Sequence, residues 1–259
     1  MNITWDANNY TDNFSFVHQY GEGVLSLLDV PTDSFVIDLG CGNGALTAKL
    51  AEKGYRVLGI DASAEMLKIA KENHPHLTFA QADATEFSLS ELGDLPAKAD
   101  AIFSNAVFHW IDAERQAQLL QTIANNLKPG GQLVFEFGGK GNAEAVHSTL
   151  EKCFQKRGLT YPRVFYFPSI GEYAPLMEKC GLQVEFATLF DRPTVQNTEN
   201  GLIDWINMFV KKPFEGMDAD LKAEILAETK ALLQDVLFVD GKWLIDYVRI
   251  RMKARKIGH

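Results

Sequence analysis

The stretch Phe35-Val-Ile-Asp-Leu-Gly-Cys-Gly-Asn-Gly44 decides the fold of this chain. It combines a short apolar run, typical of a buried strand, with a glycine-rich turn, and a helical pattern follows over 44–53. Glycines in such a turn let a ligand lie against the backbone, because no side chain stands in the way. The stretch therefore predicts a nucleotide or nucleoside site at the end of the first strand.

The residues after this turn alternate short apolar runs with helical patterns as far as Phe137, which is typical of βαβ units around a parallel sheet. Gly54 and the Lys128-Pro-Gly-Gly131 turn are the stop signals. The expected strands are 35–40, 56–61, 77–82, 99–105 and 132–137, and the expected helices are 44–53, 63–73 and 112–127.

The second half predicts further elements and a cover for the site. Ser169 and Gly181 bound a helix over 169–180, and another helix is expected over 142–157. We expect one domain over 1–259, made of the parts that follow. These are an N-terminal helical cap (1–30), a cofactor-binding core (31–140), strands 183–190 and 243–254, and a helical insertion over the substrate site (191–242).

Composition narrows the class of function. The formal net charge is -9, with 34 acidic and 25 basic residues, so the chain lacks the clustered positive charge that binds a phosphate backbone. The one basic cluster, Arg249 to Lys256, alternates with apolar residues and predicts a solvated strand face. A nucleic-acid partner is therefore not expected.

The cellular setting follows from what the sequence lacks. Three widely spaced cysteines give neither a disulfide framework nor a metal-ligand pattern. No basic-then-apolar leader begins the chain, and no apolar run reaches the roughly 18 residues of a membrane span. We expect a cytoplasmic protein with no metal and no membrane association, whose state as monomer or dimer stays open.

Three carboxylates narrow the class of ligand that this site can bind. Asp61 ends the second expected strand 21 positions after Gly40, where it can accept hydrogen bonds from both ribose hydroxyls. Asp38 lies two residues before Gly40, where a pyrophosphate would be repelled but an ammonium group attracted. Asp83, at the end of the third strand, can accept the exocyclic amine of adenine or cap the next helix. Acids at three successive strand ends favour a cationic adenosyl amino acid.

With these residues in place, the chain resembles the class I S-adenosylmethionine-dependent methyltransferases. Val36 to Gly44 is similar to their first motif, Gly59-Ile-Asp61 to their second, Gln81-Ala-Asp83 to their third, and Leu127 to Gly131 to the turn before their fifth strand. The resemblance implies an α/β fold, namely a doubly wound, mostly parallel seven-stranded sheet whose last strand is antiparallel.

The resemblance also implies the cofactor, S-adenosylmethionine, its product, S-adenosylhomocysteine, and residue roles. Asp61 would hold the ribose, and Gly40 and Gly42 the methionine portion. Asp38 would hold the loop or, through water, the amino group. The full expected cofactor-binding set is Asp38, Gly40, Gly42, Asp61, Ala62, Met66, Asp83, Ala84, Asn105 and Ala106.

The fourth strand predicts the acceptor side, because Asn105 and Phe108-His-Trp110 follow it at the carboxyl edge. Ser104-Asn-Ala-Val-Phe-His-Trp110 resembles the aromatic segment of trans-aconitate and malonyl-thioester carboxyl methyltransferases, which implies a small, acidic acceptor and carboxylate O-methylation. These relatives commonly have Gln at position 109, so the role of His109 cannot be copied. We expect hydrogen bonding or cofactor packing from it rather than proton abstraction.

Other acceptors and other functions stay open. A phenol acceptor would need a base, for which His109 and His18 are the candidates, and an amine acceptor is a further alternative. The same glycine pattern also fits a nicotinamide dehydrogenase or a noncatalytic adenosyl-binding domain. Candidate catalytic residues are His109, Trp110 and His18, and candidate substrate residues are Tyr10, Phe16, His109, Trp110, Arg163 and Trp205.

Overall fold

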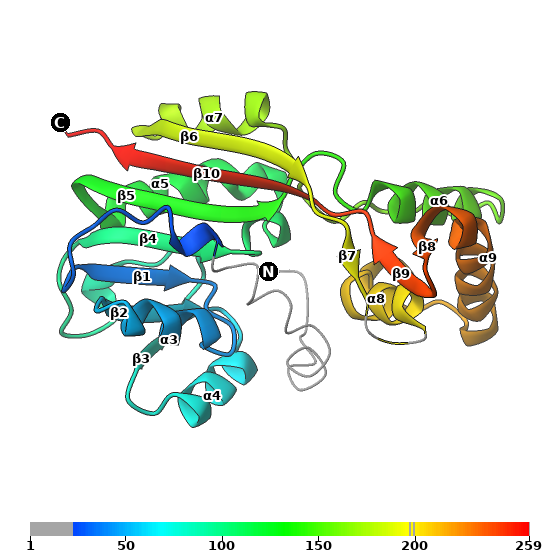
Figure 1. The fold of residues 1–259 in the computed structure, drawn as a ribbon, viewed down its shortest axis with the longest axis horizontal. Coiled ribbons are helices and arrows are strands. Elements are labelled where there is room, and N and C mark those ends of the chain that lie inside the picture. The colour runs from blue at the N-terminus through cyan, green and yellow to red at the C-terminus, as the bar shows by residue number, and fades with distance from the viewer. Residues whose placement is uncertain (1–22, 197, 199, 259) are drawn as a thin grey trace.

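The computed structural model describes residues 23–196, 198 and 200–258, and its main sheet has seven strands in the order β3-β2-β1-β4-β5-β10-β6 (Figure 1). Strands β1 to β5 pair in parallel, and β10 is antiparallel to both of its neighbours. This confirms the expected α/β fold and its antiparallel last strand. The strands are β1 (Phe35–Leu39), β2 (Arg56–Asp61), β3 (Thr78–Gln81), β4 (Ala99–Asn105), β5 (Leu127–Gly138), β6 (Leu182–Asp191) and β10 (Val248–Lys256).

Alternate residues of β1 face opposite layers, because successive side chains of a strand point to opposite faces. Ile37 is fully buried in a core cluster with residues of α5 and α7, whereas Val36 is buried with Leu46 and Leu50 of α3. Each such aliphatic side chain contributes roughly 1.5–3 kcal/mol by leaving water. The helices next to the sheet are α3 (Ala45–Glu52), α4 (Ala64–Asn73), α5 (Gln116–Asn126) and α7 (Ile170–Lys179).

Local capping explains where two of these helices begin. The Ser63 side chain accepts a hydrogen bond from the Met66 amide at the start of α4. At α7, Ser169 and Glu172 form a capping box in which each side chain accepts a hydrogen bond from the other residue's amide. The helix that the sequence predicted from Ser169 to Gly181 is confirmed.

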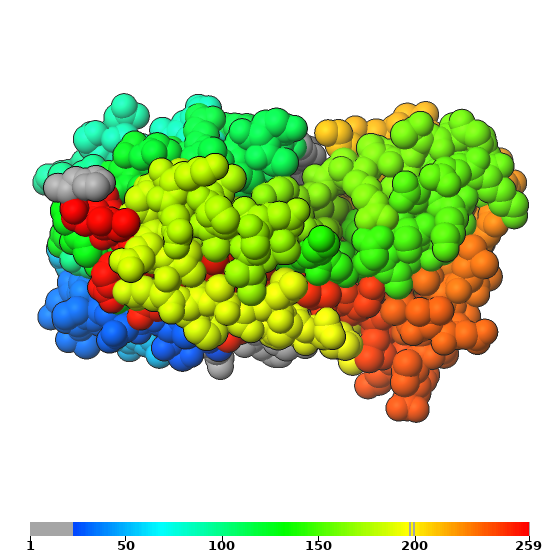
Figure 2. Space-filling view, turned by 90° about the horizontal axis from the view of Figure 1, so that it is seen from above, coloured from blue at the N-terminus to red at the C-terminus, as the bar shows by residue number. Residues whose placement is uncertain are grey.

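A smaller lobe lies beyond the carboxyl ends of the parallel strands (Figure 1). It has its own buried apolar cluster, and α6 and α9 lie side by side in it although they are far apart in the sequence (Figure 2). Its elements are α6 (Glu144–Gln155), α8 (Gly201–Phe209), α9 (Ala219–Leu237), β7 (Thr194–Val195), β8 (Phe238–Val239) and β9 (Lys242–Ile245).

Two sequence predictions need correction. The single strand expected over 243–254 is wrong, because β9 pairs with β7 and β8 in the lobe whereas β10 pairs with β5 and β6 in the main sheet. The turn expected at Lys128 to Gly131 is a bulge inside β5, since Ala99 pairs with Leu127 and Ala101 with Gln132. In both cases the decisive pairing is with strands distant in the sequence.

The expected N-terminal cap lies largely outside the described residues. Of its residues 1–30, the structure describes 23–30, in which Val24, Leu25 and Leu28 pack against the sheet in the same cluster as α3. Among the described helices, none combines the length and the apolar composition that a membrane span requires.

Candidate functional site

The glycine turn after β1 has a backbone that other residues rarely adopt. Gly40, Gly42 and Gly44 have φ values of +79°, +55° and +82°. A Cβ atom on Gly40 would lie 2.2 Å from Cγ2 of Val107, which follows β4. The turn is therefore packed against the end of β4, at the point between β1 and β4 where the strand order reverses and α/β sheets bind ligands.

Asp61 connects this turn to the end of β2. Its Oδ2 accepts a hydrogen bond of 2.9 Å from the Gly42 amide, and its Oδ1 one of 2.8 Å from the Ser63 amide. Burial raises the pKa of this carboxyl group, and these two amide bonds oppose the rise. A carboxylate has about four acceptor sites, so Asp61 retains acceptor capacity for a ribose hydroxyl.

Asp38 is buried below the turn rather than on its surface. Its Oδ2 accepts a hydrogen bond of 2.6 Å from the hydroxyl of Thr47 in α3. Burial raises its pKa to about 7, and the Thr47 bond acts in the opposite direction. This contact supports the loop-holding alternative for Asp38, because the residue ties the turn to α3.

A cleft of about 450 Å³ opens above the turn. The predicted cofactor residues Gly40, Asp61, Ala62, Asp83 and Ala84 all line it. The Asp83 Oδ1 accepts hydrogen bonds from the amide and hydroxyl of Thr85 and so stabilises a turn over 84–86; the helix expected directly after Asp83 is wrong. Asp112 adds a further acidic residue to the lining of the cleft, and Arg115 adds a positively charged one. This acid-rich wall suits a ligand that carries an ammonium and a sulfonium charge.

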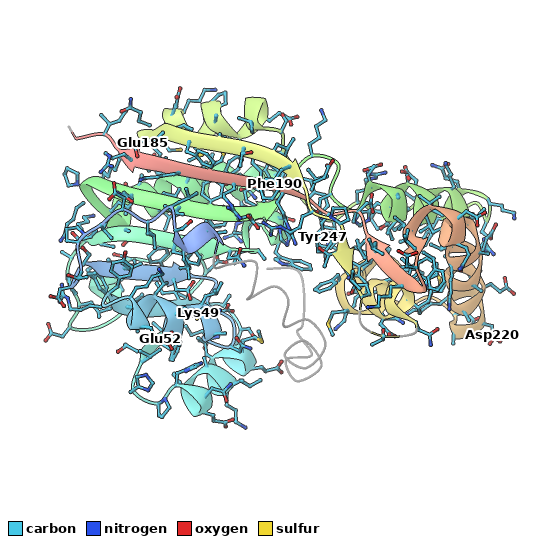
Figure 3. All side chains as sticks on the ribbon, in the orientation of Figure 1. Lys49, Glu52, Glu185, Phe190, Asp220 and Tyr247 are labelled. Carbon is cyan, nitrogen blue, oxygen red and sulfur yellow. The ribbon has the colours of Figure 1, made fainter. Side chains whose placement is uncertain are left out.

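A second cavity, also of about 450 Å³, lies beside the cleft, and Trp110 lines both. Tyr247, a further lining residue, lies at the junction between the sheet and the lobe (Figure 3). We call this space the acceptor cavity. Its lining residues are Ala106, His109, Trp110, Asn142, His147, Phe165, Phe167, Trp205, Phe209, Tyr247 and Arg249.

His109 is held in one protonation state. Its Nδ1 accepts a hydrogen bond of 3.1 Å from the Gly138 amide. Burial, and next the nearby charge of Arg249, holds the pKa of the imidazole well below its ordinary value. We assign the proton of the neutral ring to Nε2, because Nδ1 is occupied as an acceptor. His109 is thus suited to donate a hydrogen bond and poorly suited to accept a proton.

Arg249 is the residue that the sequence-based reasoning missed. The alternating pattern predicted a solvated position, but Arg249 is only 7% exposed and lines the acceptor cavity. It lies 4.3 Å over the Tyr247 ring, and β10 pairs it between Gly138 and Phe190. The sequence signal that could have indicated its burial is Tyr247, two residues earlier in the chain. A guanidinium group that stacks on an aromatic ring is commonly partly desolvated.

The other predicted residues divide into four groups. Trp205 lies in the acceptor cavity, and so does Ala106, which was expected to bind the cofactor. Arg163 lies outside it and forms ion pairs with Glu144 and Glu151. Neither Met66, which is buried close to Gly42, nor Asn105 lines either space. Tyr10, Phe16 and His18 lie outside the described residues.

Comparisons with known proteins agree with this geometry. The family described as "Methyltransferase domain" matches residues 36–131. An uncharacterized methyltransferase of Bacillus cytotoxicus is 33% identical over 72% of this chain and 88% of its own length. A trans-aconitate 2-methyltransferase of Azoarcus sp. is 28% identical over 97% of this chain and 98% of its own length.

The fold is shared with a solved structure that contains the product of the cofactor. The phosphoethanolamine N-methyltransferase 2 of Haemonchus contortus, in complex with S-adenosylhomocysteine, has a TM-score of 0.60, with 18% identity over 97% of this chain and 57% of that chain. These similarities replace the dehydrogenase interpretation of the glycine turn. The chain belongs to the class I S-adenosylmethionine-dependent methyltransferases and uses S-adenosylmethionine as its cofactor.

Proposed function

We propose that this enzyme methylates a carboxylate oxygen of a small organic acid. The observation that carries the proposal is the charge of the acceptor cavity. Arg249 is one of its lining residues, and within residues 23–196, 198 and 200–258 no Asp or Glu lines it, whereas Asp61, Asp83 and Asp112 line the adjoining cleft. An acid-rich cleft beside a cavity without acids suits a cationic methyl donor and an anionic acceptor.

A carboxylate is also the acceptor that needs least from these residues. It is ionised at neutral pH, since its ordinary pKa is about 4, so no base has to remove a proton. His109 would serve as a hydrogen-bond donor to the acid, with Arg249 as its charged partner. S-adenosylmethionine supplies an electrophilic methyl group on a sulfonium centre and leaves as S-adenosylhomocysteine. The residues of the cavity have to align the oxygen with that methyl group and keep water away.

We assign the cofactor residues by the same geometry. Gly40 and Gly42 would accommodate the methionine portion against bare backbone, Asp61 would accept hydrogen bonds from the ribose, and Asp83 with Ala84 would contact the adenine. Trp110 lines both spaces. It would therefore stand where the methyl donor and the acceptor meet.

We assign the lobe formed by α6 and residues 194–245 as the cover of the acceptor site. It supplies His147 from α6 and Trp205 from α8 to the acceptor cavity. This extends the insertion expected over 191–242, because α6 comes from an earlier part of the chain. A cover of this kind would exclude water from the reacting groups.

The relatives add support for an acid. The name of the Azoarcus relative states that its acceptor is trans-aconitate, a carboxylic acid, and the similarity extends over almost the whole of both chains. Which acid binds to the present enzyme depends on the residues that line its own acceptor cavity. We therefore propose the carboxylate class and name no single acid.

The test is an S-adenosylhomocysteine-release assay with matched panels of carboxylic acids, phenols and amines. We expect turnover of one or more acids and of none of their primary amides, which keep the shape of the acid but lack its charge. Turnover confined to phenols or amines would overturn the proposal.

A further inference from the structure

His147 is a buried imidazole that the proposed reaction does not use. It lies on α6, is 3% exposed and lines the acceptor cavity. Its Nδ1 lies 2.7 Å from the Tyr161 hydroxyl, whereas its Nε2 is buried and has no hydrogen-bond partner in the described chain. Buried polar atoms are rarely left in this state, and each one costs stability. The exception calls for an explanation.

The hydrogen bond to Tyr161 fixes which ring nitrogen carries the proton. Burial, and next the charge of Arg163, lowers the pKa of His147 to about 4, so the ring is neutral at pH 7. If Nδ1 carried the proton, then both the Tyr161 hydroxyl hydrogen and Nε2 would lack a partner. If Tyr161 donates to Nδ1, only the Nε2 hydrogen lacks one. We assign the second arrangement, in which His147 has an unused donor.

The position of His147 indicates what this donor could meet. A second hollow of about 580 Å³ adjoins the acceptor cavity, and the two share His147, Phe165 and Phe167 as lining residues. Phe165 and Phe167 stack at 5.4 Å with an angle of 10° between their planes. The ring of His109 lies 5.9 Å from Phe167, and that of His147 lies 6.1 Å from it. Both histidines therefore adjoin one apolar wall that continues from the inner space to the outer one.

We propose that the acceptor is an elongated acid and that His147 is a residue that determines its specificity. Its carboxylate lies at Arg249 and His109, its apolar body follows Phe165 and Phe167, and a carbonyl or similar oxygen along that body accepts a hydrogen bond from Nε2 of His147. The position of the carboxylate rests on the proposed function, whereas the need for a second oxygen comes from the unpartnered nitrogen.

The test uses four compounds that vary the two features independently. They are 4-oxo-4-phenylbutanoate, 4-phenylbutanoate and the primary amides of both, and their binding to the enzyme saturated with S-adenosylhomocysteine is measured by calorimetry. We expect the keto acid to bind about 10- to 100-fold more tightly than the acid without the ketone, because the latter leaves the buried donor unpaired. Equal affinity of the two, or no binding by any of the four, would overturn the inference about His147.

The same data separate this inference from the proposed function. Amides that bind as tightly as their acids contradict the carboxylate proposal, whatever the ketone does. A ketone that confers no advantage contradicts the role of His147, whatever the carboxylate does.

Variants distinguish specificity from a structural role. His147→Phe removes the donor and keeps an aromatic ring, and we expect it to reduce the preference for the ketone to less than about threefold. His147→Gln restores an N–H donor and should restore part of the preference. A purely structural role would weaken the binding of both acids equally in each variant, and that result would contradict the proposal.

Discussion

The amide of Gly138 donates a hydrogen bond of 3.1 Å to Nδ1 of His109, and this single contact limits what the histidine can do. A ring whose Nδ1 accepts from a fixed backbone N–H carries its proton on Nε2 and has no lone pair left for a base. Gly138 ends β5 and His109 follows β4, so two adjacent parallel strands set the orientation of the ring. The donor role of His109 follows from the sheet itself.

We therefore predict that replacement of His109 by another donor is tolerated. His109→Gln should keep kcat/KM for the acid within about tenfold of wild type, whereas His109→Leu, which lacks a donor, should lose about 10- to 100-fold. His76→Gln, at an exposed position, is the control and should have no effect. If kcat/KM rose with pH through a midpoint below the ordinary pKa of histidine, and His109→Gln abolished that rise, His109 would be a base and the prediction would be wrong.

Arg249 is predicted to control the affinity for the acceptor. Arg249→Gln removes the charge while leaving a polar side chain, and KM for the acid should rise by about 10- to 100-fold, as expected for the loss of a hydrogen bond to a charged group. Arg255→Gln on the same strand is the matched control, because its partner Glu185 is a surface residue and such pairs contribute little. Binding of S-adenosylhomocysteine by both variants checks that they fold. A wild-type KM in Arg249→Gln would contradict the role.

Local sequence predicts most of this fold because most of its signals are local. The capping box at Ser169 and the cap at Ser63 mark helix starts within three or four residues, and the short apolar run before Gly40 marks β1 as a buried strand. The division of the last strand is different. The segment 242–256 contains no glycine or proline that would end a strand, and only pairing with β7 and β8 on one side and β5 and β6 on the other separates it into two strands.

The same distinction between local sequence signals and contacts of distant segments applies to the candidate site. The cleft above the glycine turn could be predicted because Gly40, Asp61 and Asp83 stand at or just after strand ends whose order is set by local pattern. The acceptor cavity could not, because its residues come from the sheet and from the lobe. Arg249 lines it together with Trp205 from α8, and nothing within the sequence around Arg249 indicates that the two residues share a cavity. His147 gave no signal either, since a histidine on a helix is usually unremarkable in sequence.

The close contact of Gly40 with Val107 predicts that a single methyl group disrupts the cofactor site. In Gly40→Ala, the new Cβ would lie 2.2 Å from Cγ2 of Val107, in a backbone with φ of +79°. Gly181→Ala has nearly the same φ, +75°, but no atom within 4 Å, so it measures the backbone strain alone. We expect a loss of about 1 kcal/mol in Gly181→Ala and a further 1–3 kcal/mol in Gly40→Ala.

Two measurements decide this prediction, urea unfolding and the affinity for S-adenosylhomocysteine. Gly40→Ala should weaken cofactor binding, whereas Gly181→Ala should not. The double variant Gly40→Ala/Val107→Ala removes both γ-carbons from the contact and should recover part of the stability. Equal destabilisation by the two glycine substitutions would show that the contact with Val107 is unimportant.

Asp38 predicts a dependence of stability on pH. Burial raises the pKa of this carboxyl group to about 7 in the folded protein, compared with about 3.9 in an unfolded chain. Between these values the folded state binds a proton that the unfolded state does not. The stabilisation that the protonated Asp38 carboxyl group gives the folded state is therefore complete below pH 4 and is lost as the pH rises through 7. Asp38→Asn, which cannot ionise, should gain about 2–3 kcal/mol relative to wild type between pH 5 and pH 8.

The neighbour of Asp38 supplies the matched variant. The Thr47 hydroxyl donates to the carboxylate and favours its charged form, so Thr47→Val should move the midpoint of the pH dependence above that of wild type. Urea unfolding at half-unit intervals from pH 5 to 8 measures all three proteins, and parallel curves for wild type and Asp38→Asn would contradict the prediction.

An ammonium group bound nearby would favour the ionised carboxylate of Asp38. If Asp38 also acts on the amino group, the affinity for S-adenosylhomocysteine should rise between pH 6 and 7.5 in wild type and stay constant in Asp38→Asn, whereas a pH-independent affinity in both proteins assigns Asp38 to the loop alone.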